Sequence, residues 1–184
     1  PQTFSILIPA YETKEEHLME LLKSLSNQTY SSYEVIIADA SSSEHVKTLV
    51  FDYCDKLPTE VEKKKFIYQK LSKNEGISEN TNEALKLATG DYIGLLDHDD
   101  MLTCDALFEM QYAIEEKKKQ GIETTLLYSD EDKCNEDGTK FYEPHLKDKF
   151  NLDLILSNNY ICHFTVMKAE ILKELKLRKE FDGA

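Results

Sequence analysis

Basic residues are scarce in this sequence of 184 residues, in which 22 Lys and Arg stand against 35 Asp and Glu and give a formal charge of −13. There is no basic tail, and lysines cluster only in short mixed runs such as residues 62–65 and 115–119. Because binding to nucleic acids depends on basic side chains that neutralise phosphates, this charge balance predicts a protein without a nucleic-acid partner.

Long apolar runs are absent as well. Residues 6–11 form the longest apolar stretch near the start, far short of the ~20 residues that span a bilayer, and no later segment comes closer. No basic segment followed by an apolar one opens the chain, so nothing here predicts secretion, and we interpret Pro1 as a trimming boundary. The sequence therefore predicts a soluble protein.

Closely spaced cysteines are also missing. The four cysteines, Cys54, Cys104, Cys134 and Cys162, lie far apart and form no Cys-x-x-Cys motif. No histidine lies near them at the spacing of a zinc site. We expect reduced thiols, which favour a cytoplasmic location over a secreted one.

The residues that are present have the composition of one folded domain over residues 1–184, with 41% hydrophobic and 10% aromatic residues. Residues 4–8 and 33–38 are apolar runs that predict buried strands. Between them, leucines recur at the spacing of one helical face, at Leu18, Leu21, Leu22 and Leu25. This pattern predicts a β-α-β unit.

The alternation continues to about residue 113. We predict a helix that Ser42 or Ser43 caps and that runs to about Asp55, then a strand at residues 65–69. A helix follows over residues 77–88, ended by Gly90, then a strand at 92–96 and a helix at 102–113. Alternating strands and helices predict an α/β fold with a mostly parallel, Rossmann-like sheet flanked by helices.

After Gly121 the pattern becomes mixed. A strand is predicted at residues 124–128, followed by a polar acidic stretch over 129–138 that ends in a turn at Asp137 and Gly138. A short strand at 141–142, a helical turn at 151–156, a strand at 164–167 and a final helix at 169–175 complete the prediction.

Polar side chains follow each predicted parallel strand. Ligands of open α/β sheets bind outside the carboxyl ends of the strands, so these positions are the candidates for chemistry. Three carboxylates, Asp97, Asp99 and Asp100, lie within four residues after the fourth strand. Their mutual repulsion favours a bound divalent cation, and oxygen ligands suit Mg²⁺ or Mn²⁺ together with substrate phosphates. The competing interpretation is that Asp99 or Asp100 caps the next helix.

At these positions the sequence resembles the family two glycosyltransferases of the GT-A fold, an inverting group that uses nucleotide-diphosphate sugars. The motifs that carry the resemblance are residues 4–11, 25–30, 33–41, 74–78 with Asn82, and 88–100. A narrower likeness, to bacterial rhamnosyltransferase-like enzymes of cell-surface polysaccharide synthesis, lies in residues 128–133 and 157–163.

The resemblance implies a role for each matching residue. The donor would be a UDP- or dTDP-sugar, the acceptor a saccharide or a lipid-linked glycan, and the cofactor Mn²⁺ or Mg²⁺. Asp39 would accept a hydrogen bond from the nucleotide base, Asp97 would contact the ribose or the metal, and Asp99 would bind the metal directly, with His163 as a further ligand of metal or phosphate. The remaining nucleotide-sugar contacts would be Pro9, Ala10, Tyr11, Glu12, Asn74, Gly76 and Asn82.

The resemblance also divides the chain into a nucleotide-binding half, residues 1–100, and an acceptor-side half, residues 101–184. Acidic residues of the second half, Asp130, Glu131 and Asp132, would face the acceptor or the donor sugar. The general base is expected beyond Ala184, and lipid-linked acceptors would bring the protein to the inner face of the cell membrane as a peripheral protein.

Two departures from the family pattern concern the donor site. Residues 38–41 read Ala-Asp-Ala-Ser where many relatives carry Asp-Asp-Gly-Ser, and Thr81 precedes Asn82 where an arginine is common. Several plainer interpretations stay open, namely a core position for the Tyr11 ring, a helix cap at Asp39, and solvated side chains at His98 and Lys133.

Two other functions compete with glycosyl transfer. A module could bind nucleotide sugar and metal without transferring the sugar. An aspartyl-phosphate phosphohydrolase would also place Asp-x-Asp after a strand, but its motif belongs on the first strand rather than after three β-α units.

Overall fold

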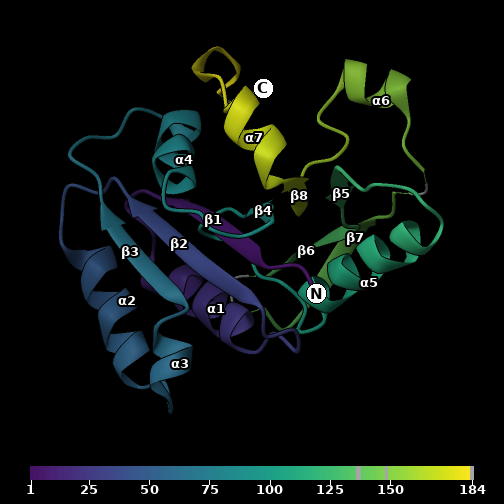
Figure 1. Cartoon of the computed structure of the whole chain (residues 1–184). Coiled ribbons are helices and arrows are strands. Elements are labelled where there is room, and N and C mark those ends of the chain that lie inside the picture. Colours follow the sequence, from purple (N-terminus) through teal and green to yellow (C-terminus); the bar gives the residue numbers. More distant parts are fainter. Residues whose placement is uncertain (136–137, 148, 183–184) are drawn as a thin grey trace.

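Strands and helices alternate through the first two thirds of the computed structural model, which describes residues 1–135, 138–147 and 149–182 (Figure 1). The strands are β1 (Phe4–Ala10), β2 (Tyr33–Asp39), β3 (Phe66–Lys70), β4 (Tyr92–Leu95), β5 (Leu126–Tyr128), β6 (Glu131–Cys134), β7 (Phe141–His145) and β8 (Thr165–Lys168). The helices are α1 (Glu15–Ser26), α2 (His45–Asp55), α3 (Glu60–Lys63), α4 (Ile77–Leu85), α5 (Ala106–Lys119), α6 (Leu152–Ser157) and α7 (Ala169–Leu175), followed by a 3₁₀ turn at Lys179–Phe181.

Six strands form one sheet in the order β3-β2-β1-β4-β8-β5. The first four strands are parallel, whereas β8 runs antiparallel to both β4 and β5. A second sheet consists of the β6-β7 hairpin alone. The predicted α/β fold, with a mostly parallel sheet and a mixed C-terminal part, is confirmed.

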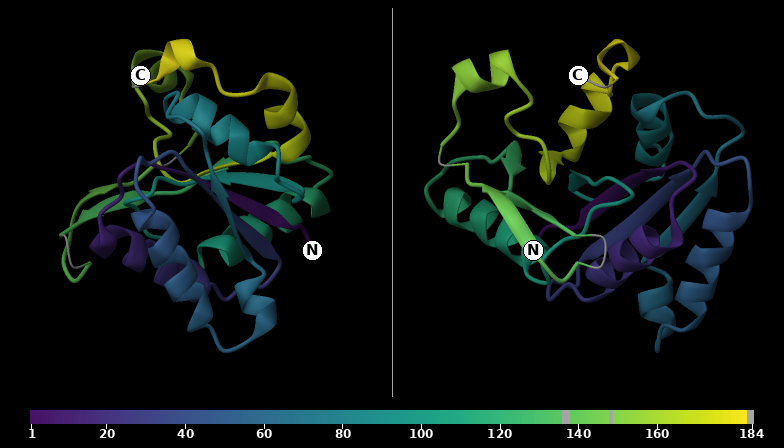
Figure 2. Two further views of the ribbon diagram at one scale, coloured as in Figure 1. Left: turned by 90° about the vertical axis from the view of Figure 1, so that its left-hand side faces the viewer. Right: turned by 180° about the vertical axis from the view of Figure 1, so that it is seen from behind.

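Helices cover both faces of the large sheet (Figure 2). On one face, Phe4, Ile6 and Ile8 of β1 pack with the apolar faces of α1, α2 and α5. On the other face, Leu7 of β1 packs with residues of α4 and α7, among them Leu172. Every residue of β1 is buried, because a central parallel strand faces helices on both sides.

Four details of the predicted elements were wrong. Gly90 does not end the fourth helix, because α4 stops at Leu85 and Gly90 instead lies where a Cβ atom would come within 2.8 Å of the Thr3 and Ser5 backbone. The fifth helix begins at Ala106, so neither Asp99 nor Asp100 caps it. The N-cap residue of α2 is Glu44 rather than Ser42 or Ser43, and the Ser43 hydroxyl makes only a long contact of 3.4 Å with the His45 amide.

The fourth detail concerns the polar stretch over residues 129–138, which was predicted without a strand but contains β6. Its Glu-Asp-Lys-Cys sequence has no apolar alternation, because the hairpin is stabilised by main-chain pairing with β7 and stands outside the large sheet. The predicted turn at Asp137 falls outside the described residues. The side-chain oxygen of Asn135, which follows β6, accepts hydrogen bonds from the amides of Thr139 and Lys140, which precede β7.

The antiparallel direction of β8 brings a late segment to the carboxyl edge of the parallel strands. Thr165 at the start of β8 pairs with Leu95 at the end of β4. Residues just before β8 therefore lie beside the residues that follow β4. Among the described residues, no helix has the length and apolar character needed to cross a membrane.

Candidate functional site

Two carboxylates and one imidazole meet at this edge of the sheet. His163 Nε2 lies 3.5 Å from Asp97 Oδ2, and His163 Nδ1 lies 3.5 Å from Asp100 Oδ2. One ligand atom from each of the three residues fits within 4.8 Å of the others. The chain brings them together because Asp97 and Asp100 follow β4 while His163 precedes β8.

The chemistry of this group fits a divalent cation. Asp100 Oδ2 is buried and forms no hydrogen bond with any described residue. Burial raises the pKa of Asp100, His163 opposes this, and the neighbouring charges of Asp97 and Asp99 raise the pKa further. A cation would relieve the repulsion between the carboxylates, whose oxygens are ligands that Mn²⁺ and Mg²⁺ accept, while an imidazole is a ligand typical of transition metals rather than of Mg²⁺.

The other two residues of this loop behave differently from Asp97 and Asp100. Asp99 is exposed and lies outside the group of three, so its predicted role as the direct metal ligand stays a prediction. His98 is not the solvated spacer of the plain interpretation. It is only partly exposed, and its Nδ1 atom is buried without a hydrogen-bond partner among the described residues.

The end of β1 presents one aromatic ring and one carboxylate. The Tyr11 side chain is 49% exposed, which excludes the core position considered for it, whereas Pro9 and Ala10 are buried within β1. Glu12 has a positive φ of 48° and accepts hydrogen bonds from the Ser42 amide and hydroxyl at 2.7 and 2.8 Å. These bonds hold the pKa of Glu12 below its usual range and tie the β1 end to the loop after β2.

Asp39 ends β2 as a fully buried carboxylate with three donors. Its Oδ1 atom accepts from the Ser41 amide at 2.8 Å, and its Oδ2 atom accepts from Tyr68 Oη at 2.6 Å and Lys70 Nζ at 3.2 Å. Burial raises the pKa of Asp39, but these hydrogen bonds together bring it below its usual value. Because α2 begins only at His45, Asp39 orders the loop after β2 and does not cap a helix.

The three residues predicted near α4 make internal contacts. Asn74 Oδ1 accepts from the Gly76 amide and from the Asn80 side chain. Gly76 has a φ of 101°, and a Cβ atom there would lie 2.2 Å from the Asp182 carboxylate. Asn82 bonds both the N–H and the C=O of Leu177, at 2.9 and 2.8 Å. Their predicted nucleotide contacts stay predictions, and the contacts present here hold the C-terminal segment against α4.

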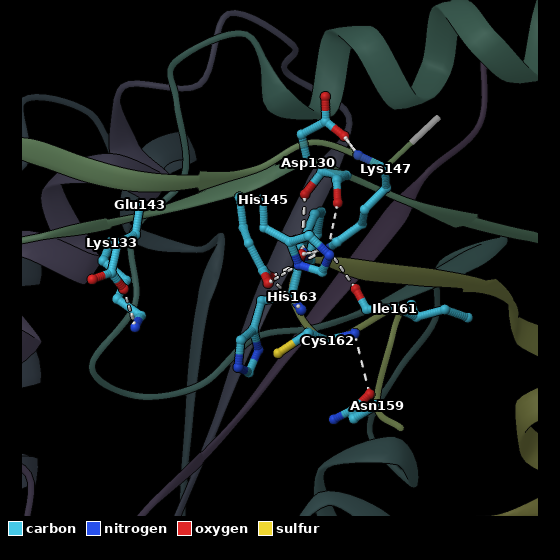
Figure 3. Close-up of polar contacts among 12 residues, drawn as sticks. Asp130, Lys133, Glu143, His145, Lys147, Asn159, Ile161, Cys162 and His163 are labelled. Carbon is cyan, nitrogen blue, oxygen red and sulfur yellow. Dashed lines mark hydrogen bonds and ion pairs between the residues drawn. The ribbon is translucent and has the colours of Figure 1, made fainter. Parts of the chain in front are cut away.

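The acidic residues at the start of β6 fall into two environments, and Figure 3 labels one of them, Asp130, beside Lys147. Asp132 is exposed, and Asp130 is exposed while its Oδ1 atom accepts from the Lys147 amide at 2.7 Å. Glu131 is 25% exposed and bonds His145 Nδ1 at 2.9 Å, the His163 amide at 3.0 Å and Lys147 Nζ at 3.2 Å. Burial opposes ionisation of Glu131, yet these bonds together lower its pKa.

Comparison of the sequence with known protein families assigns the chain to one of them. The profile described as glycosyl transferase family 2 matches residues 5–176. The chain belongs to this family. The O-antigen biosynthesis protein RfbC of Myxococcus xanthus is 32% identical over 183 residues, which cover 98% of this chain and 13% of that protein.

Solved structures place this family 2 chain in the GT-A fold. S. aureus TarS in complex with UDP matches with a TM-score of 0.75 and 23% identity, over 99% of this chain and 52% of that chain. TarS in complex with UDP-GlcNAc gives a TM-score of 0.70 at 22% identity, over 94% and 47%. The mannosyltransferase PcManGT of Pyrobaculum calidifontis, in complex with GDP-Man and Mn²⁺, matches with a TM-score of 0.52 and 21% identity, over 58% and 30%.

The chain spans about a fifth or less of the first two curated relatives that it matches, and about half of the TarS chain with UDP. The family and the GT-A fold are therefore shown, while the activity of the whole protein is a matter for proposal.

Sequence reasoning missed several residues that shape this family 2 site. Asp100 was counted in the acidic cluster but was not predicted as a metal ligand, and Tyr68 and Lys70 were predicted only as a strand end and its neighbour although both bond Asp39. Lys147, whose side chain is fully buried, stands in a sequence without apolar periodicity. Alternation along β3 could have placed Tyr68 and Lys70 on the same face as each other. We find no sequence signal for the burial of Lys147.

Proposed function

We propose that this chain forms the donor-binding part of an inverting glycosyltransferase, which moves a sugar from a UDP- or dTDP-sugar to a hydroxyl of a glycan acceptor. The observation that carries the proposal is the group of Asp97, Asp100 and His163 at the carboxyl edge of a family 2 sheet. The matched TarS structures hold UDP or UDP-GlcNAc, and RfbC is named for O-antigen biosynthesis. These names support a role in bacterial cell-surface polysaccharide synthesis.

Negative charge develops on the nucleoside diphosphate as the sugar leaves. A bound Mn²⁺ or Mg²⁺ supplies the positive charge that stabilises this leaving group. The geometry favours Asp97, Asp100 and His163 as the residues that hold the cation, and the sequence motif adds the exposed Asp99 from the same loop. The Mn²⁺ in the PcManGT complex is consistent with this choice of metal.

The ends of β1 and β2 are proposed to hold the nucleoside. The exposed Tyr11 ring offers an aromatic face to a pyrimidine. Asp39 keeps the adjoining loop in place through Ser41, and its hydrogen bond from the base, which the family resemblance implies, is part of this proposal. Glu12 fixes the same loop through Ser42.

Inversion requires a carboxylate that takes the proton of the acceptor hydroxyl. Of the three acidic residues predicted to face the acceptor or the donor sugar, Asp130 and Asp132 are exposed. The Glu131 carboxylate accepts hydrogen bonds from His145, Lys147 and the His163 amide, so we assign it no role in proton transfer. The acceptor is proposed to be a saccharide or a lipid-linked glycan, with peripheral binding at the inner face of the membrane.

Calorimetric titration with UDP, dTDP, GDP and CDP, each with and without Mn²⁺, tests the donor site. We expect a pyrimidine diphosphate to bind only with metal, and this binding to be lost in Asp97→Asn. Comparison of Asp99→Asn with Asp100→Asn identifies the second carboxylate ligand, since the larger loss marks it. Absence of binding under every condition would contradict the proposal.

Sugar release separates transfer from binding alone. A transferase is expected to release sugar slowly from a bound UDP-sugar when water replaces the acceptor, whereas a binding module retains the intact donor. Chromatography of the nucleotide after incubation distinguishes the two, and Asp97→Asn is the negative control.

A further inference from the structure

The ammonium group of Lys147 lies inside a cage of oxygen atoms. Its side chain has no exposed area, and Nζ lies 2.6 Å from Ile161 O, 2.8 Å from Ser129 O and 2.9 Å from His163 O. A carboxylate oxygen, Glu131 Oε2, completes the cage at 3.2 Å. A buried charge is costly unless it is paired and hydrogen-bonded, and here both conditions are met.

The same two residues hold the backbone of His163 from both sides. Glu131 Oε2 accepts from the His163 amide at 3.0 Å, while Lys147 Nζ donates to the His163 carbonyl at 2.9 Å. Residue 163 stands in a loop just before β8, where no ladder of strand hydrogen bonds fixes it. These two side chains make its shortest backbone hydrogen bonds, beside a longer one of 3.4 Å from Ser129 Oγ to the His163 carbonyl.

We propose that Lys147 and Glu131 are positioning residues that keep the imidazole of His163 beside Asp97 and Asp100. This inference rests on the proposed function, because it gives the fixed imidazole a purpose as a metal ligand. Residues that orient a metal ligand from behind typically change metal affinity by about 10–100-fold when removed. Neither Lys147 nor Glu131 needs to touch the metal or the donor for this effect.

Substitutions of the pair are compared with an exposed pair on the same hairpin. Lys147→Met removes the ammonium group and keeps the volume of the side chain, and Glu131→Ala removes the carboxylate. Lys133→Met serves as the matched control, since the Lys133–Glu143 ion pair of β6 and β7 is about two thirds exposed. Glu131→Gln retains an oxygen that can accept from the His163 amide, so we expect it to lie between the wild type and Glu131→Ala.

The first readout needs no metal. In protein labelled at histidine Cε1, the His163 signal is assigned by its loss in His163→Ala. We expect this signal to move in Lys147→Met and in Glu131→Ala and to stay in place in Lys133→Met. An unchanged His163 signal in a folded Lys147→Met protein would overturn the inference. If Lys147→Met does not fold, as judged by circular dichroism, Glu131→Ala and its rescue by Glu131→Gln decide in the same way.

The second readout is Mn²⁺ affinity by calorimetry. We expect a loss of about tenfold in Lys147→Met and none in Lys133→Met. The double variant of Lys147→Met with His163→Ala should bind no more weakly than His163→Ala alone, because Lys147 acts through His163. Additive losses would overturn the inference. If the wild type binds no Mn²⁺, the proposed function fails, and the position of the His163 signal still decides whether the pair orients this residue.

Discussion

The imidazole of His163 lies 3.5 Å from the carboxylate of Asp97, although the two residues belong to different parts of the chain. Asp97 follows a parallel strand, and His163 precedes a strand that runs in the opposite direction beside it. The candidate metal site is therefore formed by the junction of the parallel part and the mixed part of the fold.

Removal of either side chain should weaken metal binding. We expect Asp97→Asn and His163→Ala each to raise the dissociation constant for Mn²⁺ by about tenfold or more, equivalent to at least 1.4 kcal/mol. Calorimetric titration measures this change. Asp52→Asn, which removes an exposed carboxylate of α2, is the control for the loss of one negative charge and should leave the affinity unchanged.

A methyl group at Gly90 should destabilise the fold. The Cβ atom of Gly90→Ala would lie 2.8 Å from Ser5 N and from Thr3 O, and overpacking of this kind costs about 1–3 kcal/mol. Urea denaturation measures the loss in the free energy of unfolding. Ser72→Ala, at an exposed loop position, should stay within about 0.5 kcal/mol of the wild type. Equal stability of Gly90→Ala and Ser72→Ala would contradict the prediction.

Asn82 should hold the C-terminal segment on α4. Asn82→Ala removes two hydrogen bonds to Leu177, worth about 1–2 kcal/mol together. We expect trypsin to cleave after Lys176, Arg178 or Lys179 about 5–30 times faster. Titration of the same variant with UDP tests the ligand contact that the sequence predicts for Asn82. A drop in UDP affinity with unchanged cleavage would favour that contact over the structural role.

Tyr33 should make stability sensitive to alkaline pH. Burial raises the pKa of Tyr33 to about 12 from its ordinary value of 10.0, and its hydroxyl donates to Leu25 O at 2.6 Å. The unfolded chain releases this proton near pH 10.0 while the folded chain retains it. The stabilisation is therefore complete below that pH and is lost as the pH rises to about 12.

Chemical denaturation of wild type and Tyr33→Phe across this alkaline range checks the sign. The free energy of unfolding of the wild type should fall relative to that of Tyr33→Phe as the pH increases. A difference that stays constant across the range would show that Tyr33 ionises alike in both states.

Much of the fold follows from local patterns in the sequence. The four leucines of α1 and the apolar runs of β1 and β2 predict their elements because a helix buries every third or fourth residue and a central parallel strand is buried throughout. The α7 helix was predicted at its observed residues. The hairpin strand β6 was missed, because two-stranded pairing outside the core leaves no apolar pattern.

The sequence by itself determined the α/β class, the mostly parallel sheet and the position of the acidic loop at its carboxyl edge, since the alternation of strands with helices and the polar residues after each strand are local residue patterns. The tertiary structure alone decided which carboxylates meet His163 and which side chains hold it in place. Asp100, Glu131 and Lys147 acquire these roles only when the antiparallel β8 lies beside β4. Contacts between distant segments depend on chain direction and burial, which no local spacing records.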